Sequence, residues 1–137
     1  MKISTRGRYG LKAMVDIAAN CKEGCVSLKT IADRNNLSES YLEQLIAPLK
    51  KAGLVKSTRG ANGGYILAKS AEDISVGDIL RVVEGPLELV ECLSGKETCG
   101  TGDCSHCATK DVWAKLSESV TEAADNISLY EIVKGII

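Results

Sequence analysis

The densest group of reactive side chains lies in one short stretch of the C-terminal half. It holds four cysteines and the only histidine of the chain: Cys92, Cys99, Cys104, Cys107 and His106. Three glycines fall between them and no long apolar run crosses the stretch, which predicts a polar loop rather than a core element. Thiolates at this density either bind a metal or pair with one another.

The hydropathy of the chain predicts where the protein is located, and the location decides whether its thiols stay reduced. Residues 1–10 are basic and polar with no apolar segment after them, so we expect no signal peptide. No stretch approaches the roughly 18 consecutive apolar residues that a membrane span needs. We therefore expect a cytoplasmic protein without membrane contact, in which disulfides are rare and thiols are free for metal or redox chemistry.

The spacing of the clustered cysteines admits three kinds of site. Thiolates are suitable ligands for iron–sulfur clusters and for Zn²⁺. Structural zinc sites usually contain two closely spaced ligand pairs, whereas here only Cys104 and Cys107 form one. The spacing thus favours a cluster over zinc, and a redox-active thiol pair is the third alternative. We expect Cys21 and Cys25, far away in the sequence, to be reduced and half-buried, or else an auxiliary redox pair.

Charge is divided unevenly along the chain. Residues 1–70 carry 12 Lys and Arg against 5 Asp and Glu, whereas residues 71–137 carry 5 against 13. The first half is therefore a candidate surface for a polyanion such as nucleic acid. A chance asymmetry of solvated faces is the alternative.

Hydrophobic periodicity predicts a mainly helical chain with one small hairpin. Apolar residues recur every three or four positions, and serines that can cap a helix precede several of these segments. We expect helices at 5–20, 28–34, 39–52, 75–84 and 109–126, a short helix after Ser128, and strands at 54–57 and 65–68 around a glycine-rich turn.

A short helix, a tight turn, a second helix and a basic hairpin form the winged helix-turn-helix pattern. The second helix presents polar side chains opposite its leucine stripe, and the hairpin tip and the N-terminus add cations that suit phosphates. The predicted DNA-binding residues are Ser38, Ser40, Tyr41, Glu43, Gln44, Arg59, Gly60, Lys2, Arg6 and Arg8. The alternative is a helical domain of this shape that binds no DNA.

The helix predicted at 109–126 carries an apolar stripe with heptad spacing. Its members are Trp113, Leu116, Val120, Ala123 and Ile127. We expect this stripe to form a dimer interface with a second copy of the chain, because a slender helix beyond a compact basic domain has little else to bury against. Packing on its own domain is the alternative.

Three motifs make the chain similar to a known family. They are MKISTRGRYG at 1–10, SYLEQL at 40–45 and GLVKSTRGANGGY at 53–65. They resemble the winged-helix transcription factors related to the iron–sulfur cluster regulator IscR, a family that includes the nitric-oxide-sensing NsrR and the cysteine-metabolism repressor CymR. The resemblance covers nearly the whole chain. It implies a homodimer, formed through the long helix after the cysteines, that binds double-stranded DNA.

The resemblance also implies that three cysteines of each chain bind an iron–sulfur cluster. Cys92 and Cys99 match the first two family cysteines. Cys107 matches the third, because the family places that cysteine six residues before a tryptophan, here Trp113. In IscR-like proteins the cluster is of the [2Fe–2S] type, which we therefore expect in preference to [4Fe–4S].

The resemblance leaves the fourth ligand open. IscR-like proteins carry a ligating histidine three residues after their last cysteine, where this chain has Lys110. Cys104 or His106 could take that place.

These predictions divide the chain into three parts. A winged helix-turn-helix domain spans 1–85, with the helix-turn-helix at 28–52, the wing at 54–68 and a further helix at 75–84. A cysteine-rich cluster-binding loop spans 86–108, and a dimerisation helix with a short C-terminal helix spans 109–137. The predicted function is a transcriptional regulator, not an enzyme, that senses iron–sulfur cluster status and regulates cluster biogenesis or related genes. The alternatives are an iron–sulfur carrier or redox protein, and a zinc-stabilised repressor without cluster sensing.

Overall fold

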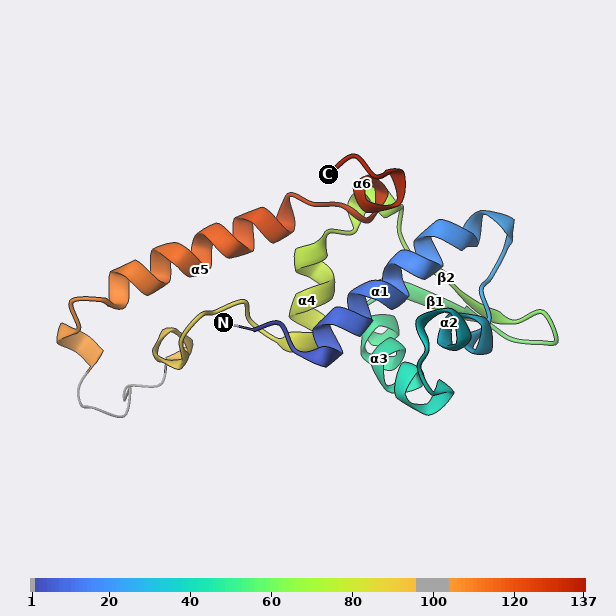
Figure 1. The fold of residues 1–137 in the computed structure, drawn as a ribbon, viewed down its shortest axis with the longest axis horizontal. Helices are drawn as coiled ribbons and strands as arrows, with labels where there is room; N and C mark the ends of the chain where they lie inside the picture. The colour runs from blue at the N-terminus through green and yellow to red at the C-terminus, as the bar shows by residue number, and fades with distance from the viewer. Residues whose placement is uncertain (1, 96–103) are drawn as a thin grey trace.

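A computed structural model describes residues 2–95 and 104–137, apart from the side chain of Cys104. These residues form a mainly helical structure with a two-stranded antiparallel hairpin, which confirms the predicted fold class (Figure 1). With η for a 3-10 helix, the elements are α1 Thr5–Asn20, η1 Cys21–Glu23, α2 Leu28–Asn35, α3 Glu39–Lys51, β1 Val55–Thr58, β2 Gly64–Leu67, η2 Ala71–Asp73, α4 Val76–Glu84, η3 Glu91–Ser94, η4 Cys104–His106, α5 Lys110–Asp125 and α6 Leu129–Lys134.

Local hydrogen bonds explain where most of these helices begin. Five α-helices follow a serine whose hydroxyl oxygen accepts a hydrogen bond from a backbone N–H of the first turn: Ser4, Ser27, Ser38, Ser75 and Ser128. In α4 and α6 the capping box is complete, because Asp78 and Glu131 accept in return from the backbone N–H of the capping serine. Caps of this kind typically contribute about 1 kcal/mol each.

Helix α1 runs through the centre of the core and packs against α2, α3, α4 and α6. Its residues Met14 and Ile17 are completely buried. A Cβ atom at Gly10 would lie 3.1 Å from Val83, so the glycine allows α4 to approach α1 closely. Further core side chains come from α2, α3, α4, β1 and α6, where Leu129 is completely buried, and from the connecting residues Val26, Leu54 and Ile74.

The hairpin is attached to the segment that precedes α2. Strands β1 and β2 pair with Val55 opposite Leu67. On the other edge of β2, the backbone of Val26 exchanges two hydrogen bonds with Tyr65, at 2.9 and 2.8 Å. A Cβ atom at Gly64 would lie 2.3 Å from the carbonyl oxygen of Val26, so only glycine allows this close approach.

Helix α5 reaches away from the rest of the molecule and returns to it at its C-terminal end (Figure 1). There the Val76 N–H donates to the Ile127 carbonyl at 2.8 Å. The guanidinium of Arg81 also lies 2.7 Å from the Asp125 carboxylate. Helix α5 ends at Asp125, so Ile127, which we predicted as the last member of the apolar stripe, lies beyond the helix in this junction.

Candidate functional site

Helix α3 carries apolar and polar residues on different faces. The face toward the core contains the aliphatic residues Leu42, Leu45, Ile46 and Leu49. Ser40, Glu43 and Gln44, three of the predicted DNA-binding residues, are exposed. Their hydroxyl, carboxylate and amide groups are those that contact base edges and phosphates in a major groove. Helix α3 is therefore suited to reading DNA.

Two other predicted DNA-binding residues of α3 also have structural roles. The hydroxyl oxygen of Ser38 accepts a hydrogen bond from the Tyr41 N–H at 3.1 Å. The half-buried Tyr41 ring meets Tyr9 edge to face, with ring centroids 6.4 Å apart and planes at 86°. The ammonium group of Lys12 lies 5.3 Å from the centroid of the Tyr9 ring. These contacts hold the start of α3 against α1.

Glu43 connects α3 electrostatically to the hairpin. Burial and, secondarily, the negative charge of Glu43 raise the pKa of Tyr65 in β2 above its ordinary value. Helix α3 also packs against β1, so the helix and the hairpin are held together in one body.

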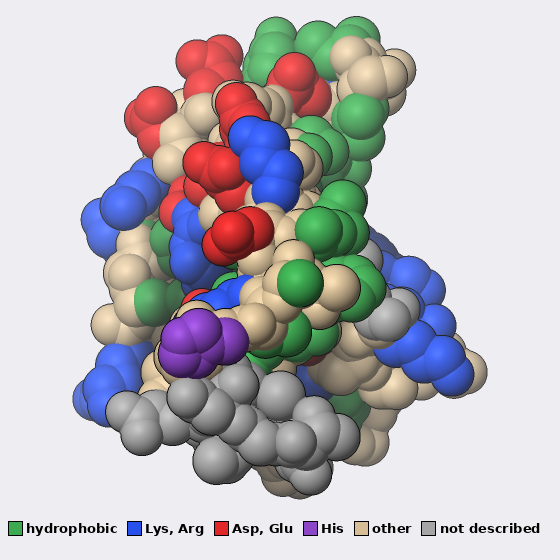
Figure 2. Space-filling model, turned by 90° about the vertical axis from the view of Figure 1, so that its left-hand side faces the viewer, with side chains coloured by type: hydrophobic (Ala, Val, Ile, Leu, Met, Phe, Trp, Pro, Cys, Tyr) green, Lys and Arg blue, Asp and Glu red, His purple; other side chains and the backbone are tan. Residues whose placement is uncertain are grey.

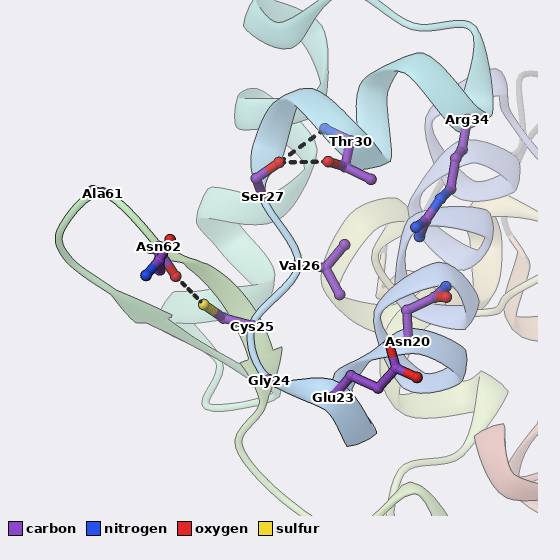
Figure 3. Close-up of a pocket in the computed structure, with 11 residues that line it drawn as sticks. Asn20, Glu23, Gly24, Cys25, Val26, Ser27, Thr30, Arg34, Ala61 and Asn62 are labelled. Carbon is purple, nitrogen blue, oxygen red and sulfur yellow. Dashed lines mark hydrogen bonds between the residues drawn. The ribbon is translucent and has the colours of Figure 1, made fainter.

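The wing, residues 54–68, has an exposed tip and an anchored base. Arg59 and Gly60 are exposed at the tip, and the positive φ of 113° at Gly60 suits a glycine. Beneath the tip, the Cys25 thiol donates to the Asn62 carbonyl at 2.7 Å, and a cavity of about 420 Å³ opens between this contact, η1 and the start of α2 (Figure 3). The sequence did not predict this contact, because no periodicity relates residues so far apart.

The cations of the N-terminal segment lie at the start of α1. Lys2, Arg6 and Arg8 are exposed, as their predicted role requires. The backbone N–H of Ser4 donates to the Glu84 carboxylate at 2.8 Å, and the Ser4 hydroxyl donates to the same oxygen. Glu84, which no sequence pattern indicated, therefore positions the basic segment. Arg8 also borders a groove between α1, α2 and α6.

The cysteine segment is described on both sides of residues 96–103. Cys92 is half-buried in η3, and Cys107 is exposed between η4 and α5. The Cys107 Sγ lies 3.3 Å from the Thr109 hydroxyl oxygen. His106 is exposed, its Nδ1 lies 2.9 Å from the Ser105 hydroxyl oxygen, and Figure 2 shows the imidazole (purple) on the surface of this end of the molecule.

Part of the predicted ligand set falls outside the described residues. This is the case for Cys99 and for the side chain of Cys104. In the two described ranges, no three side chains of the His, Cys, Asp or Glu type gather closely enough to hold a metal ion. The metal site therefore stays a prediction, with Cys92 and Cys107 as its two described members.

Helix α5 anchors the segment that carries Cys92. The Leu89 N–H donates to the hydroxyl of Ser117 at 3.0 Å, and Ser117 is the buried polar residue of α5. The η3 helix, which contains Cys92, packs against α5. Cys107 comes shortly before the same helix. Both described cysteines thus lie next to α5, Cys92 in a segment that packs against the helix and Cys107 three residues before its start.

The predicted interface stripe is largely uncovered by its own chain. Trp113 is 37% and Leu116 45% exposed, Ala123 is exposed and Val120 is half-buried. Val112, which the prediction did not include, is 52% exposed beside them. The face toward the body buries small residues instead. Neither α5 nor any other helix within the described ranges is long and apolar enough to cross a membrane.

Comparison with known proteins identifies relatives over almost the whole chain. The family model Rrf2, described as an iron-dependent transcriptional regulator, matches residues 3–135. The HTH-type transcriptional regulator CymR of Bacillus subtilis (strain 168) is 48% identical over 132 residues, which are 96% of this chain and 89% of the relative. The HTH-type transcriptional regulator IscR of Pectobacterium carotovorum subsp. carotovorum (strain PC1) is 43% identical over 135 residues, which are 98% of this chain and 80% of the relative.

Solved structures of such relatives share the fold. CymR of B. subtilis, described as its global cysteine regulator, has a TM-score of 0.82 at 45% identity, and the match covers 98% of this chain and 97% of CymR. IscR of T. potens has a TM-score of 0.81 at 49% identity, and the match covers 100% of this chain and 89% of that protein. These matches confirm the resemblance to IscR and CymR. The chain belongs to the Rrf2 family of DNA-binding transcriptional regulators.

Proposed function

We propose that two copies of the chain bind double-stranded DNA through α3 and the wing, and that an iron–sulfur cluster on the cysteine segment controls this binding. The exposed polar side chains of α3 support base reading. Arg59 and the basic N-terminal segment support phosphate contacts. The proposal assigns 1–85 to DNA binding, 86–108 to the cluster and 109–137 to dimerisation.

The exposed stripe of α5 supports the homodimer. Trp113, Leu116 and Val112 are large apolar side chains, and burying them against a second copy would remove them from water. A symmetric pair of α5 helices would place the same residues of each copy against one another. Two α3 helices would then meet successive major grooves of one duplex.

The observation that carries the cluster proposal is the attachment of both described cysteines to α5. Thiolates are the ligands that iron–sulfur clusters use, so Cys92 and Cys107 fit the group chemically. Cys99 would be the third ligand, and Cys104 or His106 the fourth. We favour [2Fe–2S] over [4Fe–4S]. When bound, the cluster would supply a rigid link between residues that the chain alone connects through a polar loop.

Such a link could change DNA binding because α5 is fixed to the body at its other end. The Val76–Ile127 hydrogen bond and the Arg81–Asp125 ion pair join the end of α5 to α4. Ordering the cysteine segment would favour one placement of α5, and thus of the two reading helices, over another. Forms with and without the cluster would then prefer different operators, with Glu43 contributing to the choice. Unchanged preferences in Glu43→Ala would exclude that contribution.

A second candidate is a regulator that responds to cysteine supply without a cluster. The similarity to CymR, described as a global cysteine regulator, favours it. An iron–sulfur carrier and a zinc-stabilised repressor are two further alternatives. Metal content and DNA binding together distinguish all four.

Anaerobic purification followed by iron, sulfide and zinc analysis tests the cluster. We expect iron, sulfide and visible absorption in the unmodified chain, and their loss in Cys92→Ala, Cys99→Ala and Cys107→Ala. Cys104→Ala and His106→Ala identify the fourth ligand. Cys21→Ala is the matched control, because Cys21 lies in η1, remote in sequence, and should leave the iron content unchanged. Zinc without iron would favour the zinc-stabilised repressor, and no metal would favour the cysteine-responsive regulator.

Selection from a random duplex pool followed by a salt titration tests DNA binding. A regulator should select a defined duplex, and its affinity should fall steeply with salt because bound counterions are released from the phosphates. Arg59→Ala should reduce the slope of log affinity against log salt by about one unit. A carrier would select no duplex.

A further inference from the structure

A groove at the base of the wing has no role in the functions proposed above. It has a volume of about 520 Å³ and lies where α3 ends and the two strands of the hairpin meet the body. The cationic residues that line it are Lys50, Lys56 and Lys69, and all three are exposed. The lining also includes the buried Val55 and the half-buried Ala68. The groove is therefore a basic surface with a small apolar part.

Three separate segments bring the lysines of the groove together. Lys50 belongs to the last turn of α3, Lys56 lies in β1, and Lys69 follows β2. The Ala68 N–H donates to the Leu54 carbonyl at 3.0 Å, which joins the end of β2 to the start of β1. The gathering of positive charge therefore depends on the packing of the hairpin beside α3, and no sequence motif indicated it.

The positive charge of the groove is not compensated. Among the described residues that line it there is no carboxylate. Within residues 2–95 and 104–137, none of the three lysines forms an ion pair. The carboxylates closest to Lys69 in the sequence, Glu72 and Asp73, line a different hollow beside Arg81. Exposed charges of one sign in one groove should attract a polyanion.

Helical periodicity places Lys50 on the face of α3 that carries the base-reading residues. Glu43, Ala47 and Lys50 are separated by four and three positions, so they form one stripe, and all three are exposed. Seven residues of helix span about 10 Å, which approaches the width of a major groove, about 12 Å. With Glu43 among the base edges, Lys50 therefore lies near the phosphates that border the groove of the DNA.

Lys56 continues this series of charges toward the tip of the wing. It lies three residues before Arg59, a distance of about 10 Å in extended chain. Since the proposed function places Arg59 at phosphates, the base of the wing lies between that contact and α3. A DNA strand that passes from α3 to the wing tip therefore crosses the lysine groove.

We propose that this groove binds the phosphates of the DNA strand that runs between α3 and the wing tip, with Lys50, Lys56 and Lys69 as the cationic contacts. This inference rests on the proposed DNA binding and extends it to three further residues. The lysine ammonium is a point charge on a flexible stem, and a phosphate contact carries no sequence information. The groove should therefore contribute affinity, whereas Glu43 and Gln44 contribute sequence preference.

Salt titrations of charge variants on the selected duplex and on a scrambled duplex test the proposal. Lys50→Gln, Lys56→Gln and Lys69→Gln should each reduce the slope of log affinity against log salt by about one unit. Each should weaken binding of both duplexes by the same factor, because every sequence carries the same phosphates. Lys56→Arg keeps the charge and should keep the slope. Unchanged slopes in all three Gln variants would overturn the proposal.

Lys115→Gln is the matched control for net charge. The Lys115 side chain is 77% exposed on α5, and α5 and the hairpin lie at opposite ends of the molecule (Figure 1). The slope of this variant should equal that of the unmodified chain. A reduction as large as in Lys56→Gln would mean that net charge, rather than contact at the groove, sets the slope, and would overturn the proposal.

Ethylation of single phosphates locates the contact on the DNA. An ethyl group removes the charge of one phosphate, so it interferes with binding where a cation contacts that phosphate. The unmodified chain should show interference at phosphates between those near α3 and those contacted by Arg59. In a chain with both Lys50→Gln and Lys56→Gln this interference should disappear, while the interference that depends on Arg59 should stay. Unchanged interference in the double variant would contradict the proposal.

The three lysines are exposed, so their Gln variants should fold, and circular dichroism checks this. If one variant does not fold, the other two still test the proposal by their slopes.

The proposed function and this inference fail in different ways. An unmodified chain that selects no duplex would refute DNA binding and the inference with it. A chain that selects a duplex, but whose salt dependence is the same without the three lysines, would refute the inference alone.

Discussion

The body and the arm of the molecule differ in how completely each buries its apolar residues. The body, residues 2–84 and 126–137, contains the core around α1, with Met14, Ile17 and Leu42 completely buried. The arm, residues 85–95 and 104–125, leaves Trp113 and Leu116 partly in solvent. In the space-filling view of the end that bears the cysteine segment, hydrophobic side chains (green) lie at the surface among acidic ones (Figure 2). Among the described residues, the body exposes large apolar side chains only on α6 and near its two ends, whereas the arm exposes them on the face of a long helix.

This difference follows from geometry. Helix α1 lies in the middle of four other helices, so its buried apolar residues meet several neighbours. Helix α5 contacts the rest of the chain mainly through α4 and η3, and small residues face those contacts. A helix with neighbours on only one side cannot also bury an apolar stripe on its other side. The stability of the body is therefore expected to be independent of protein concentration, and that of the arm to depend on it.

The same substitution in the two regions should give the largest contrast. Leu42→Ala removes a completely buried side chain, and we expect the free energy of unfolding of the body to fall by about 3 kcal/mol at every protein concentration. Leu116→Ala changes a side chain that is 45% exposed and should affect unfolding only through dimer formation. Denaturant titrations at two protein concentrations measure both. Equal effects of the two substitutions would remove the distinction between body and arm.

Trp113→Ala should weaken the dimer. Removing an aromatic side chain from the centre of an interface typically costs about 2 kcal/mol of binding free energy or more. Sedimentation equilibrium measures the change in the dimer dissociation constant. Lys115→Ala is the control, because that side chain is 77% exposed and its ion pair with Glu118 is a surface contact. A dimer that is unaffected by Trp113→Ala would place the interface on another face.

Gly64→Ala should loosen the wing without unfolding the body. The added Cβ atom would lie 2.3 Å from the Val26 carbonyl oxygen, so the bridge between Val26 and Tyr65 must open. We expect affinity for the selected duplex to fall about tenfold, which corresponds to about 1.4 kcal/mol. Hydrogen exchange should accelerate at the Tyr65 amide, which donates to that oxygen. Unchanged exchange at Tyr65 would show that the wing is held by other contacts.

The smallest expected effect is that of acid on the junction between body and arm, measured as a change in the free energy of unfolding. Burial opposes ionisation of Asp78, but hydrogen bonds from the Ser75 N–H and hydroxyl and from Arg81 hold its pKa below its ordinary value of 3.8. A carboxyl with a lowered pKa in the folded state stabilises it at neutral pH, and this contribution disappears as the pH falls through about 4 and below. The difference in unfolding free energy between the unmodified chain and Asp78→Asn should therefore be about 1 kcal/mol or less at pH 7 and shrink toward pH 3. A difference that grows on acidification would contradict the assignment.

Features that depend on neighbours in the sequence were predicted well. The helix starts at Ser4, Ser27, Ser38 and Ser75 agree with the expected bounds within one residue. Ser40, Glu43 and Gln44 are exposed on α3 as predicted, because opposite faces of a helix follow from its period alone, whereas Tyr41 is half-buried against Tyr9. Each strand was shifted by one residue, because strand ends depend on pairing across the hairpin rather than on local preference.

Contacts between distant segments were not predictable. The Glu84 carboxylate that holds Ser4, the Val26 bridge to Tyr65 and the Cys25 thiol on the wing join residues with no sequence signal. Val112 was missed because it falls outside the heptad positions. The groove that Arg8 and Lys12 border depends on the packing of α6 beside α1, so no sequence pattern predicted it.

The sequence by itself determined the elements, the family and the reactive groups: capped helices, the motifs of an Rrf2 regulator, a basic half and a cluster of cysteines. These properties lie in side-chain type and in spacing along the chain. Only the tertiary structure decided which surfaces are complete. In the folded chain α1 is surrounded by other helices, and the wing is hydrogen-bonded to Val26. The segment with Cys92 packs against α5, and Trp113 stays partly exposed. Burial depends on which distant segments come together, and that is a property of the packed chain rather than of any stretch within it.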